Sequence, residues 1–346
     1  MANLSQLKFA MATSIFLSAF IFGLLVFAIV FFLQLDAFTG LLVALGGSAL
    51  FILFQYAIGP AIVAATTRLH YLKPGENPWF ESMVKELADK SGISMPRLAT
   101  VPDKTPNAFT FGRNTSSATL ALHDGLLEQL NENEIKGVIA HELGHIKHKD
   151  YIVMTVLSAL PLIAYLIAQV ALRGGMLSGG RRNKDNSGAV LLIIGGIAFA
   201  IYIITFLIVM RLSRLREHYA DAYSAYVTGS PRELESALAK ITYGLSLSPK
   251  APQGTRAFYI EDPGAAKQEI QHIMEQKDKY DLDRDGVLDE RELEMAMEKE
   301  AKSTWVQMNS LFATHPPTFK RILLLKEIET EMNTGKYSTD KVYAHV

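Results

Sequence analysis

The sequence of 346 residues predicts a mainly α-helical integral membrane protein with four transmembrane helices and an α+β domain outside the bilayer. Hydrophobic residues make up 49% of the chain, and the excess is concentrated in four stretches without a charged residue. Each stretch holds about 20 residues, the length that an α-helix needs to cross the hydrocarbon core of a bilayer. The remainder of the chain has the composition of a soluble domain.

Residues 1–60 are expected to form a transmembrane hairpin, with spans at 14–33 and 41–58 joined by a short link. A cleaved signal peptide would also begin with an apolar stretch. The first stretch is too long for a signal peptide and lacks a small-x-small exit site, so we expect a helix that stays in the membrane.

Residues 61–150 are expected to form the first half of the domain. The spacing of apolar residues predicts a helix at Pro78–Ser91 and another near residue 140. Asp124 is expected to cap a short helix that runs through Leu126 and Leu127. Runs of strand-forming residues predict three short strands, at Arg97–Val101, Ala108–Phe111 and Thr119–Leu122.

The helix near residue 140 contains the pattern His-Glu-x-x-His. His141 and His145 are four positions apart, so both imidazoles lie on one helical face and can reach a single metal ion. Glu142 can then take a proton from a water that the metal polarises. The alternative is a surface helix that carries two histidines and no metal. Since the chain has no cysteine, a metal here needs histidine and carboxylate ligands.

Residues 151–210 are expected to form a second transmembrane pair, with spans at 151–172 and 189–210. The link at 173–188 is rich in Gly and Ser and is predicted to be a loop. Residues 211–262 are expected to complete the soluble domain, with a helix at 231–245 and a loop at 246–264.

A catalytic zinc site takes three protein ligands and keeps a position open for water. Glu217 is the best candidate for the third ligand, and Asp221, one turn later, can accept the ring N–H of a ligating histidine. Two spans separate Glu217 from His141, so both residues lie on the same side of the membrane. The alternative is that Glu217 and Asp221 form a solvated helix face paired with Arg214 and Arg216.

Residues 263–303 contain an insertion whose centre fits a calcium-binding EF-hand loop. Such a loop supplies oxygen ligands at positions 1, 3, 5, 7, 9 and 12, with a turn glycine at position 6. Gly286 is the turn glycine, and helical flanks are expected at 265–280 and 291–299. The alternative is an acidic helical hairpin that binds no calcium. The predicted ligands are Asp281, Asp283, Asp285, Val287 through its carbonyl, Asp289 and Glu292.

Residues 304–346 are expected to form a C-terminal segment with the motif His-Pro-Pro and a helix at 319–331. Together with the other motifs, this segment resembles the membrane-embedded zinc metallopeptidases of the M48 class, over roughly 60–245 and 305–330. The chain is most similar to HtpX-type heat-shock proteases and more distantly to Ste24-type prenyl-protein endopeptidases. The motifs are Asn107-Ala108-Phe109 with Gly112, Gly125-Leu126-Leu127, Ala140-His141-Glu142-Leu143-Gly144-His145, Arg216-Glu217, Ala220-Asp221, Thr314-His315-Pro316-Pro317 and Arg321-Ile322.

The resemblance implies a gluzincin-type α+β protease domain with one zinc ion per chain. The zinc ligands are then His141, His145 and Glu217, Glu142 is the general base, and Asp221 lies beside the ligands. Neither His148 nor His218 is needed as a ligand, and we expect both at the surface.

The resemblance also implies roles for residues outside the ligand helices. Asn107, Ala108 and Phe109 bind the main chain of the substrate as an added strand. His315 donates to the oxyanion, and Arg321 lies near the zinc carboxylates. The EF-hand-like insertion departs from the typical HtpX-type pattern.

The leading hypothesis is an endopeptidase of the plasma membrane that removes misfolded or damaged membrane proteins. Its partners are protein substrates and the lipid bilayer. A net charge of −1 shows no excess of basic residues that would indicate nucleic-acid binding. Basic residues after the second and fourth spans put the catalytic domain in the cytoplasm, although the basic link at 173–188 opposes this orientation. The alternatives are a Ste24-like prenyl-protein endopeptidase and a calcium-responsive membrane scaffold without catalysis.

Overall fold

The computed structural model describes residues 5–34, 36–178, 187–247, 259–284, 288–300, 313, 315–337 and 342–343. The chain divides into two compact units. One unit comprises Lys8–Gly59 and Ile152–Leu212. The other comprises Met1–Leu7, Pro60–Tyr151 and Ser213–Val346, and it contains the candidate site.

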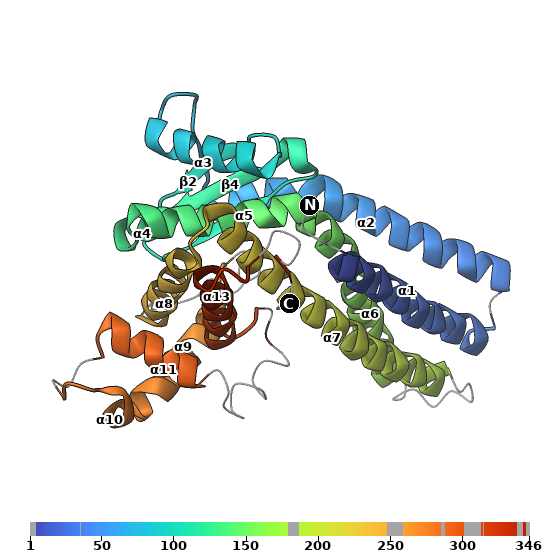
Figure 1. The fold of residues 1–346 in the computed structure, drawn as a ribbon. Coiled ribbons are helices and arrows are strands. Elements are labelled where there is room, and N and C mark those ends of the chain that lie inside the picture. The colour runs from blue at the N-terminus through green and yellow to red at the C-terminus, as the bar shows by residue number, and fades with distance from the viewer. Residues whose placement is uncertain are drawn as a thin grey trace. The chain divides into compact units, whose positions relative to one another are not determined.

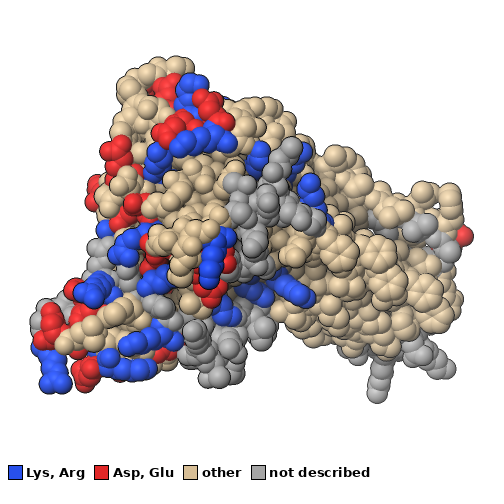
Figure 2. Space-filling view, viewed as in Figure 1, with Lys and Arg blue, Asp and Glu red and all other residues tan. Residues whose placement is uncertain are grey.

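The first unit is built from long apolar helices. Four helices in the described part of the chain are long and apolar enough to cross a membrane: α1 (Ser5–Phe32), α2 (Ala37–Thr67), α6 (Asp150–Ser178) and α7 (Ser187–Thr228). Large side chains such as Phe16 and Val170 point outward, and small ones such as Ala164 and Ala198 lie in the core between helices. Large apolar side chains outside and small ones inside are the reverse of the arrangement in a soluble domain, and this arrangement is typical of helices packed in lipid. The visible surface over α1 and α2 is almost free of charge (Figure 2).

A four-stranded sheet forms one layer of the second unit. Its strands are β1 (His70–Tyr71), β2 (Arg97–Val101), β3 (Ala108–Phe111) and β4 (Thr119–His123), in the order β1-β2-β4-β3. β2 is parallel to β4, whereas β1 and β3 pair antiparallel with their neighbours. Among the described strands β3 therefore lies at one edge of the sheet.

Helices form the rest of the second unit. α5 (Glu132–His148) packs against β3 on one side and against α8 (Pro231–Leu247) on the other, and α13 (Thr318–Asn333) packs on α8 (Figure 1). A core that includes Tyr280, Phe319 and Ile322 joins α13 to the insertion. The other elements are α3 (Pro78–Ser91), the 3-10 turn η1 (Thr115–Ser117), α4 (Asp124–Gln129), α9 (Pro263–Glu275), α10 (Lys277–Tyr280) and α11 (Glu290–Glu300).

Local sequence fixes both ends of α5. The side chain of Asn131 accepts from the backbone N–H of Glu134, and the side chain of Glu134 accepts from the backbone N–H of Asn131, which is a capping box. Lys149 ends the helix in the left-handed region, with φ of 60°. Gly144 permits a close approach to α7, because a Cβ there would lie 3.2 Å from the Cα of Ala220. This contact brings the two helices with the predicted ligands together.

Several predicted boundaries need correction. The N-cap of α4 is His123, not Asp124 as predicted. Asp124 lies in the first turn, where its negative charge interacts favourably with the helix dipole. The third apolar helix continues to Ser178, so part of the predicted loop is helical. The first flank of the insertion breaks at Gln276 into α9 and α10. The two-residue strand β1 was not predicted, because it is too short for a periodic pattern.

Candidate metal centre

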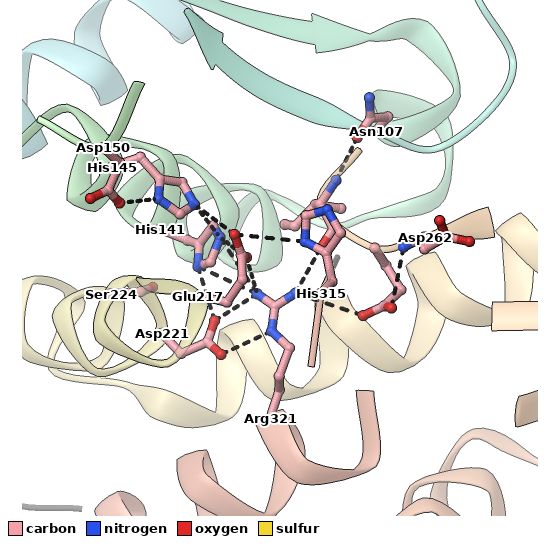
Figure 3. A network of polar contacts seen from close by, with 12 residues as sticks. Asn107, His141, His145, Asp150, Glu217, Asp221, Ser224, Asp262, His315 and Arg321 are labelled. Carbon is pink, nitrogen blue, oxygen red and sulfur yellow. Dashed lines mark hydrogen bonds and ion pairs between the residues drawn. The ribbon is translucent and has the colours of Figure 1, made fainter. Parts of the chain in front are cut away.

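Three predicted ligands converge at one point in the second unit. His141 and His145 come from α5 and Glu217 from α7, and one ligand atom from each lies within 4.8 Å of the others (Figure 3). The Nε2 atoms of the two histidines are 3.1 Å apart. The Nε2 atoms of His141 and His145 are 3.4 and 3.5 Å from the two carboxylate oxygens of Glu217.

The cluster is buried. Glu217 is 6% exposed and Asp221 is fully buried, so the alternative of a solvated helix face is wrong. Oε2 of Glu217 has no hydrogen-bond partner in the described part of the chain. A buried carboxylate oxygen without a donor is costly unless a cation compensates for it. The donor set and this oxygen therefore fit a metal ion.

Each histidine is oriented by its own carboxylate. Nδ1 of His141 lies 2.9 Å from Oδ1 of Asp221, and Nδ1 of His145 lies 2.7 Å from Oδ2 of Asp150. A carboxylate only accepts, so each Nδ1 carries a proton, and each Nε2 is the atom that can present a lone pair to a metal ion at the shared point. The second carboxylate oxygen of Asp150 lies 2.8 Å from Nε of Arg216.

Asp150 was not among the site residues predicted from the sequence. Its position five residues after His145 was the available signal. Asp221, by contrast, occupies the place beside His141 that its spacing predicted.

Arg321 forms ion pairs with the carboxylates of both Asp221 and Glu217. Its Nε and Nη2 donate to the two oxygens of Asp221 at 2.9 and 2.7 Å, and Nη2 lies 3.8 Å from Oε2 of Glu217. The guanidinium is fully buried, and the neighbouring carboxylates raise its pKa although burial lowers it. Burial also lowers the pKa of His141, but the nearby carboxylates of Asp221 and Glu217 outweigh burial and raise it to about 9. The site therefore favours a positive charge at His141, which a proton or a metal ion can supply.

Glu142 and His315 are also in the buried interior of this unit. Glu142 lies on α5 between the two histidines. Nδ1 of His315 lies 3.6 Å from Oε1 of Glu217, and the charge of Glu217 raises the pKa of His315 against the opposing effect of burial. A protonated imidazole beside the cluster is a hydrogen-bond donor.

A short segment links β3 to the cluster. Oδ1 of Asn107 accepts from the backbone N–H of Ile260 at 2.9 Å, and the carbonyl of Ile260 accepts from Nη1 of Arg321 at 2.6 Å (Figure 3). Ala108 and Phe109 follow Asn107 in β3. The next residue after Ile260, Glu261, is fully buried, and burial raises its pKa to about 7. This segment could not be predicted as part of the site, because its residues lie in a stretch that was expected to be loop.

The calcium loop is described only in part. Asp281, Asp283 and Glu292 each place a carboxylate oxygen within 4.8 Å of the others. The carboxylate of Glu292 also accepts from the backbone N–H groups of Leu282 and Asp289, at 2.6 and 3.1 Å. Asp289, also a predicted ligand, is not in this group, and its Oδ1 accepts from the backbone N–H of Glu292 at 2.8 Å. Asp285, Gly286 and Val287 lie outside the described residues.

The prediction that His148 lies at the surface is wrong. His148 is 8% exposed, and its Nε2 lies 3.0 Å from the hydroxyl of Tyr343. His218 is half-buried rather than exposed. Neither belongs to the group of three potential ligands.

Comparison with known proteins identifies the family. The model of peptidase family M48 matches residues 74–329. A protease HtpX homologue of Aeropyrum pernix is 32% identical over 316 residues, which are 86% of this chain and 91% of that protein. An HtpX homologue of Thermococcus sibiricus is 34% identical, over 91% of this chain and 95% of its own length. The crystal structure of Saccharomyces mikatae Ste24p aligns with a TM-score of 0.47 at 17% identity, over 91% of this chain and 63% of that chain.

The apolar helices and the His-His-Glu cluster, taken with these relatives, define a membrane metalloprotease. The chain belongs to peptidase family M48.

The carboxylate of Asp150 is expected to control metal affinity. Asp150→Asn keeps the size of the side chain but weakens the bond that orients His145, so the affinity for a metal ion should fall by about 10- to 100-fold. Competition with a chromophoric chelator measures this change, and circular dichroism checks that the fold is retained. Asp89→Asn, at an exposed position on α3, is the matched control. An unchanged dissociation constant for Asp150→Asn would contradict the orienting role.

Proposed function

We propose that this chain is a zinc-dependent endopeptidase, of the EC 3.4.24 type, that hydrolyses misfolded or damaged membrane proteins in quality control. The observation that carries the proposal is the buried convergence of His141, His145 and Glu217, with Glu142 between the two histidines on the same helix. Two neutral imidazoles and one carboxylate are a donor set that catalytic zinc uses, and they leave a coordination position for water.

His141, His145 and Glu217 would hold the zinc ion. When bound, zinc acts as a Lewis acid that polarises a water molecule and the peptide carbonyl. Glu142 takes a proton from the attacking water and passes it to the leaving amine. His315 donates a hydrogen bond to the oxyanion that develops on the carbonyl. Arg321 keeps Asp221 ionised, and Asp221 keeps the ring of His141 in the tautomer that a ligand needs.

The edge strand β3 is the proposed docking site for the substrate main chain. The edge of β3 away from β4 can accept an extended peptide as an additional strand along Asn107, Ala108 and Phe109, with the backbone groups of Ala108 facing the peptide. Asn107 holds the adjoining segment at Ile260, which in turn contacts Arg321. A peptide on β3 would thus lie along a strand that is connected to the metal centre through these contacts of Ile260.

The four apolar helices are proposed to cross the plasma membrane and to leave the catalytic domain in the cytoplasm. The proposed order is a hairpin at 1–60, the first half of a gluzincin-type domain at 61–150, a second pair at 151–210, the second half at 211–262, the insertion at 263–303 and the C-terminal segment at 304–346. Basic residues after α2 and within α7 support this orientation, since they favour the cytoplasmic side.

Two alternatives make different predictions. A Ste24-like enzyme would cleave prenylated peptides in preference to unfolded protein. A calcium-responsive scaffold would hold zinc without cleaving either. The placement of Glu142 between the two histidines favours an enzyme, because a structural site needs no base there.

We also propose that the insertion binds calcium and that calcium modulates cleavage. The observation in favour is the gathering of Asp281, Asp283 and Glu292, since hard cations prefer carboxylate oxygens. Tyr280 and Leu293, at the two ends of the loop, pack in one core with Phe319 and Ile322 of α13. Since α13 also carries Arg321, ordering of the loop can influence the metal centre.

Glu142→Gln is expected to keep zinc and to lose cleavage. The amide cannot act as the base, so cleavage of an unfolded reporter protein in detergent should fall by about 100- to 10,000-fold. Glu128→Gln, an exposed change on α4, should cleave like the wild type. Zinc content is measured for each protein. Equal cleavage by wild type and Glu142→Gln would refute the assigned base, and zinc-loaded wild type without activity on any peptide would favour the scaffold.

The calcium proposal predicts a rate that changes with calcium concentration. Asp281→Ala with Glu292→Ala should abolish calcium binding in titration calorimetry and remove the calcium dependence of cleavage. The matched control is Glu275→Ala with Asp278→Ala, two exposed acidic residues nearby. If the first double variant loses calcium binding but cleaves like the wild type at every calcium concentration, calcium has no regulatory role.

A further inference from the structure

The fully buried guanidinium of Arg321 has a second carboxylate near each of its two terminal nitrogens. Nη2 lies 3.8 Å from Oε2 of Glu217, and Nη1 lies 3.8 Å from Oε2 of Glu261. Both distances are too long for a hydrogen bond. The shortest hydrogen bonds of Nη2 and Nη1 go to Asp221 and to the carbonyl of Ile260, at 2.7 and 2.6 Å. Arg321 therefore has one ionic contact with a proposed metal ligand and an equally distant one with a residue outside the ligand set.

Arg321 and a metal ion would compete for the same oxygen of Glu217. This oxygen, Oε2, has no hydrogen-bond partner in the described part of the chain, and it lies 3.4 Å from Nε2 of His141. A shift of the guanidinium by about 1 Å would bring Nη2 to hydrogen-bonding distance of Oε2. A charge-assisted hydrogen bond there would occupy a lone pair that the metal needs. The metal centre therefore requires the guanidinium to be held away from Glu217.

The side chain of Glu261 is placed to hold the guanidinium. It is fully buried, and its Oε1 accepts from the backbone N–H of Asp262 at 3.2 Å. Oε2 has no hydrogen-bond partner among the residues that the structure describes, so no hydrogen bond offsets its attraction for Nη1 of Arg321. Such an attraction is stronger in a buried site than at the surface, because the local dielectric constant is low.

The backbone on both sides of Glu261 is fixed. Ile260, before it, donates its N–H to the side chain of Asn107 at 2.9 Å. Asp262, after it, is the N-cap of α9, and its carboxylate accepts from two backbone N–H groups at the start of that helix, at 2.7 and 3.0 Å. The carboxylate of Glu261 is therefore held in place, and its attraction acts on the longer side chain of Arg321.

Buried neighbours set the charge of Glu261. Burial raises its pKa to about 7, against the opposing charges of Arg321 and His315, and the charge of Glu217 raises it further. Glu269, on α9, is also buried, and its pKa is raised by burial and by the charge of Glu261. Two neighbouring buried carboxyls do not ionise together readily. We therefore expect the two to share one proton at neutral pH, with the negative charge on Glu261, beside Arg321.

We propose that Glu261 is a positioning residue of the metal centre: its carboxylate attracts Nη1 of Arg321 and so keeps Nη2 away from Oε2 of Glu217. The proposal rests on the proposed zinc site, and Glu261 contacts neither zinc nor substrate in it. It also connects the insertion to the metal centre by a route that needs no calcium, because Glu269 belongs to α9.

Zinc affinity at two pH values tests this role. Glu261→Gln keeps the size of the side chain but never carries the charge. Because the pKa of Glu261 is about 7, the wild type has this charge at pH 8 and has mostly lost it at pH 6. The variant should therefore bind zinc about 10-fold more weakly than the wild type at pH 8 and nearly equally at pH 6. Competition with a chromophoric chelator in detergent measures each value. Glu275→Gln, an exposed change on α9, should match the wild type at both pH values.

The position of Arg321 separates this role from a simple attraction between Glu261 and the metal ion. In crystals of the metal-free Glu261→Gln variant at pH 8, Nη2 should lie within about 3.2 Å of Oε2 of Glu217. Unchanged affinity at pH 8, an equal loss at both pH values, or a loss at pH 8 with Arg321 in its present place would each overturn the proposal. These readouts need no cleavage, so a wild type that binds zinc but cleaves nothing would refute the proposed function alone.

Discussion

The metal centre depends on one buried ion pair, between Arg321 and Asp221. Both groups are fully buried, and two parallel hydrogen bonds join them. Asp221 in turn holds Nδ1 of His141, and Arg321 holds the carbonyl of Ile260. Loss of one partner would leave the other charge uncompensated, at a typical cost of about 3–5 kcal/mol. One pair therefore connects α7, α13 and the segment before α9 to His141, the first of the proposed zinc ligands.

The two histidines depend on separate carboxylates from separate helices. Asp221 orients His141 from α7, whereas Asp150 orients His145 from the first residue of α6. Asp150 is itself held by Arg216, the residue directly before Glu217, the third proposed ligand. The two histidines lie on α5, Asp150 lies on α6, and Glu217 and Asp221 lie on α7. The centre therefore requires all three helices to be in place.

Much of the centre could be predicted from local sequence. The spacing of His141 and His145 and that of Glu217 and Asp221 follow helical periodicity, and the helices α5 and α7 bear out that periodicity. Contacts between residues far apart in sequence could not be predicted. His148 read as a surface residue because the residue that covers it, Tyr343, lies 195 positions later. Ile260 contributes only backbone atoms to Asn107 and Arg321, so no side-chain pattern marks its role.

Anomalous X-ray scattering at the zinc absorption edge, from crystals of the purified protein, tests the central claim most directly. The account predicts one strong peak per chain at about 2.0–2.2 Å from Nε2 of His141, Nε2 of His145 and a carboxylate oxygen of Glu217. A peak bonded to fewer than these three residues would contradict it. So would zinc bound only at Asp281, Asp283 and Glu292, or no peak at saturating zinc.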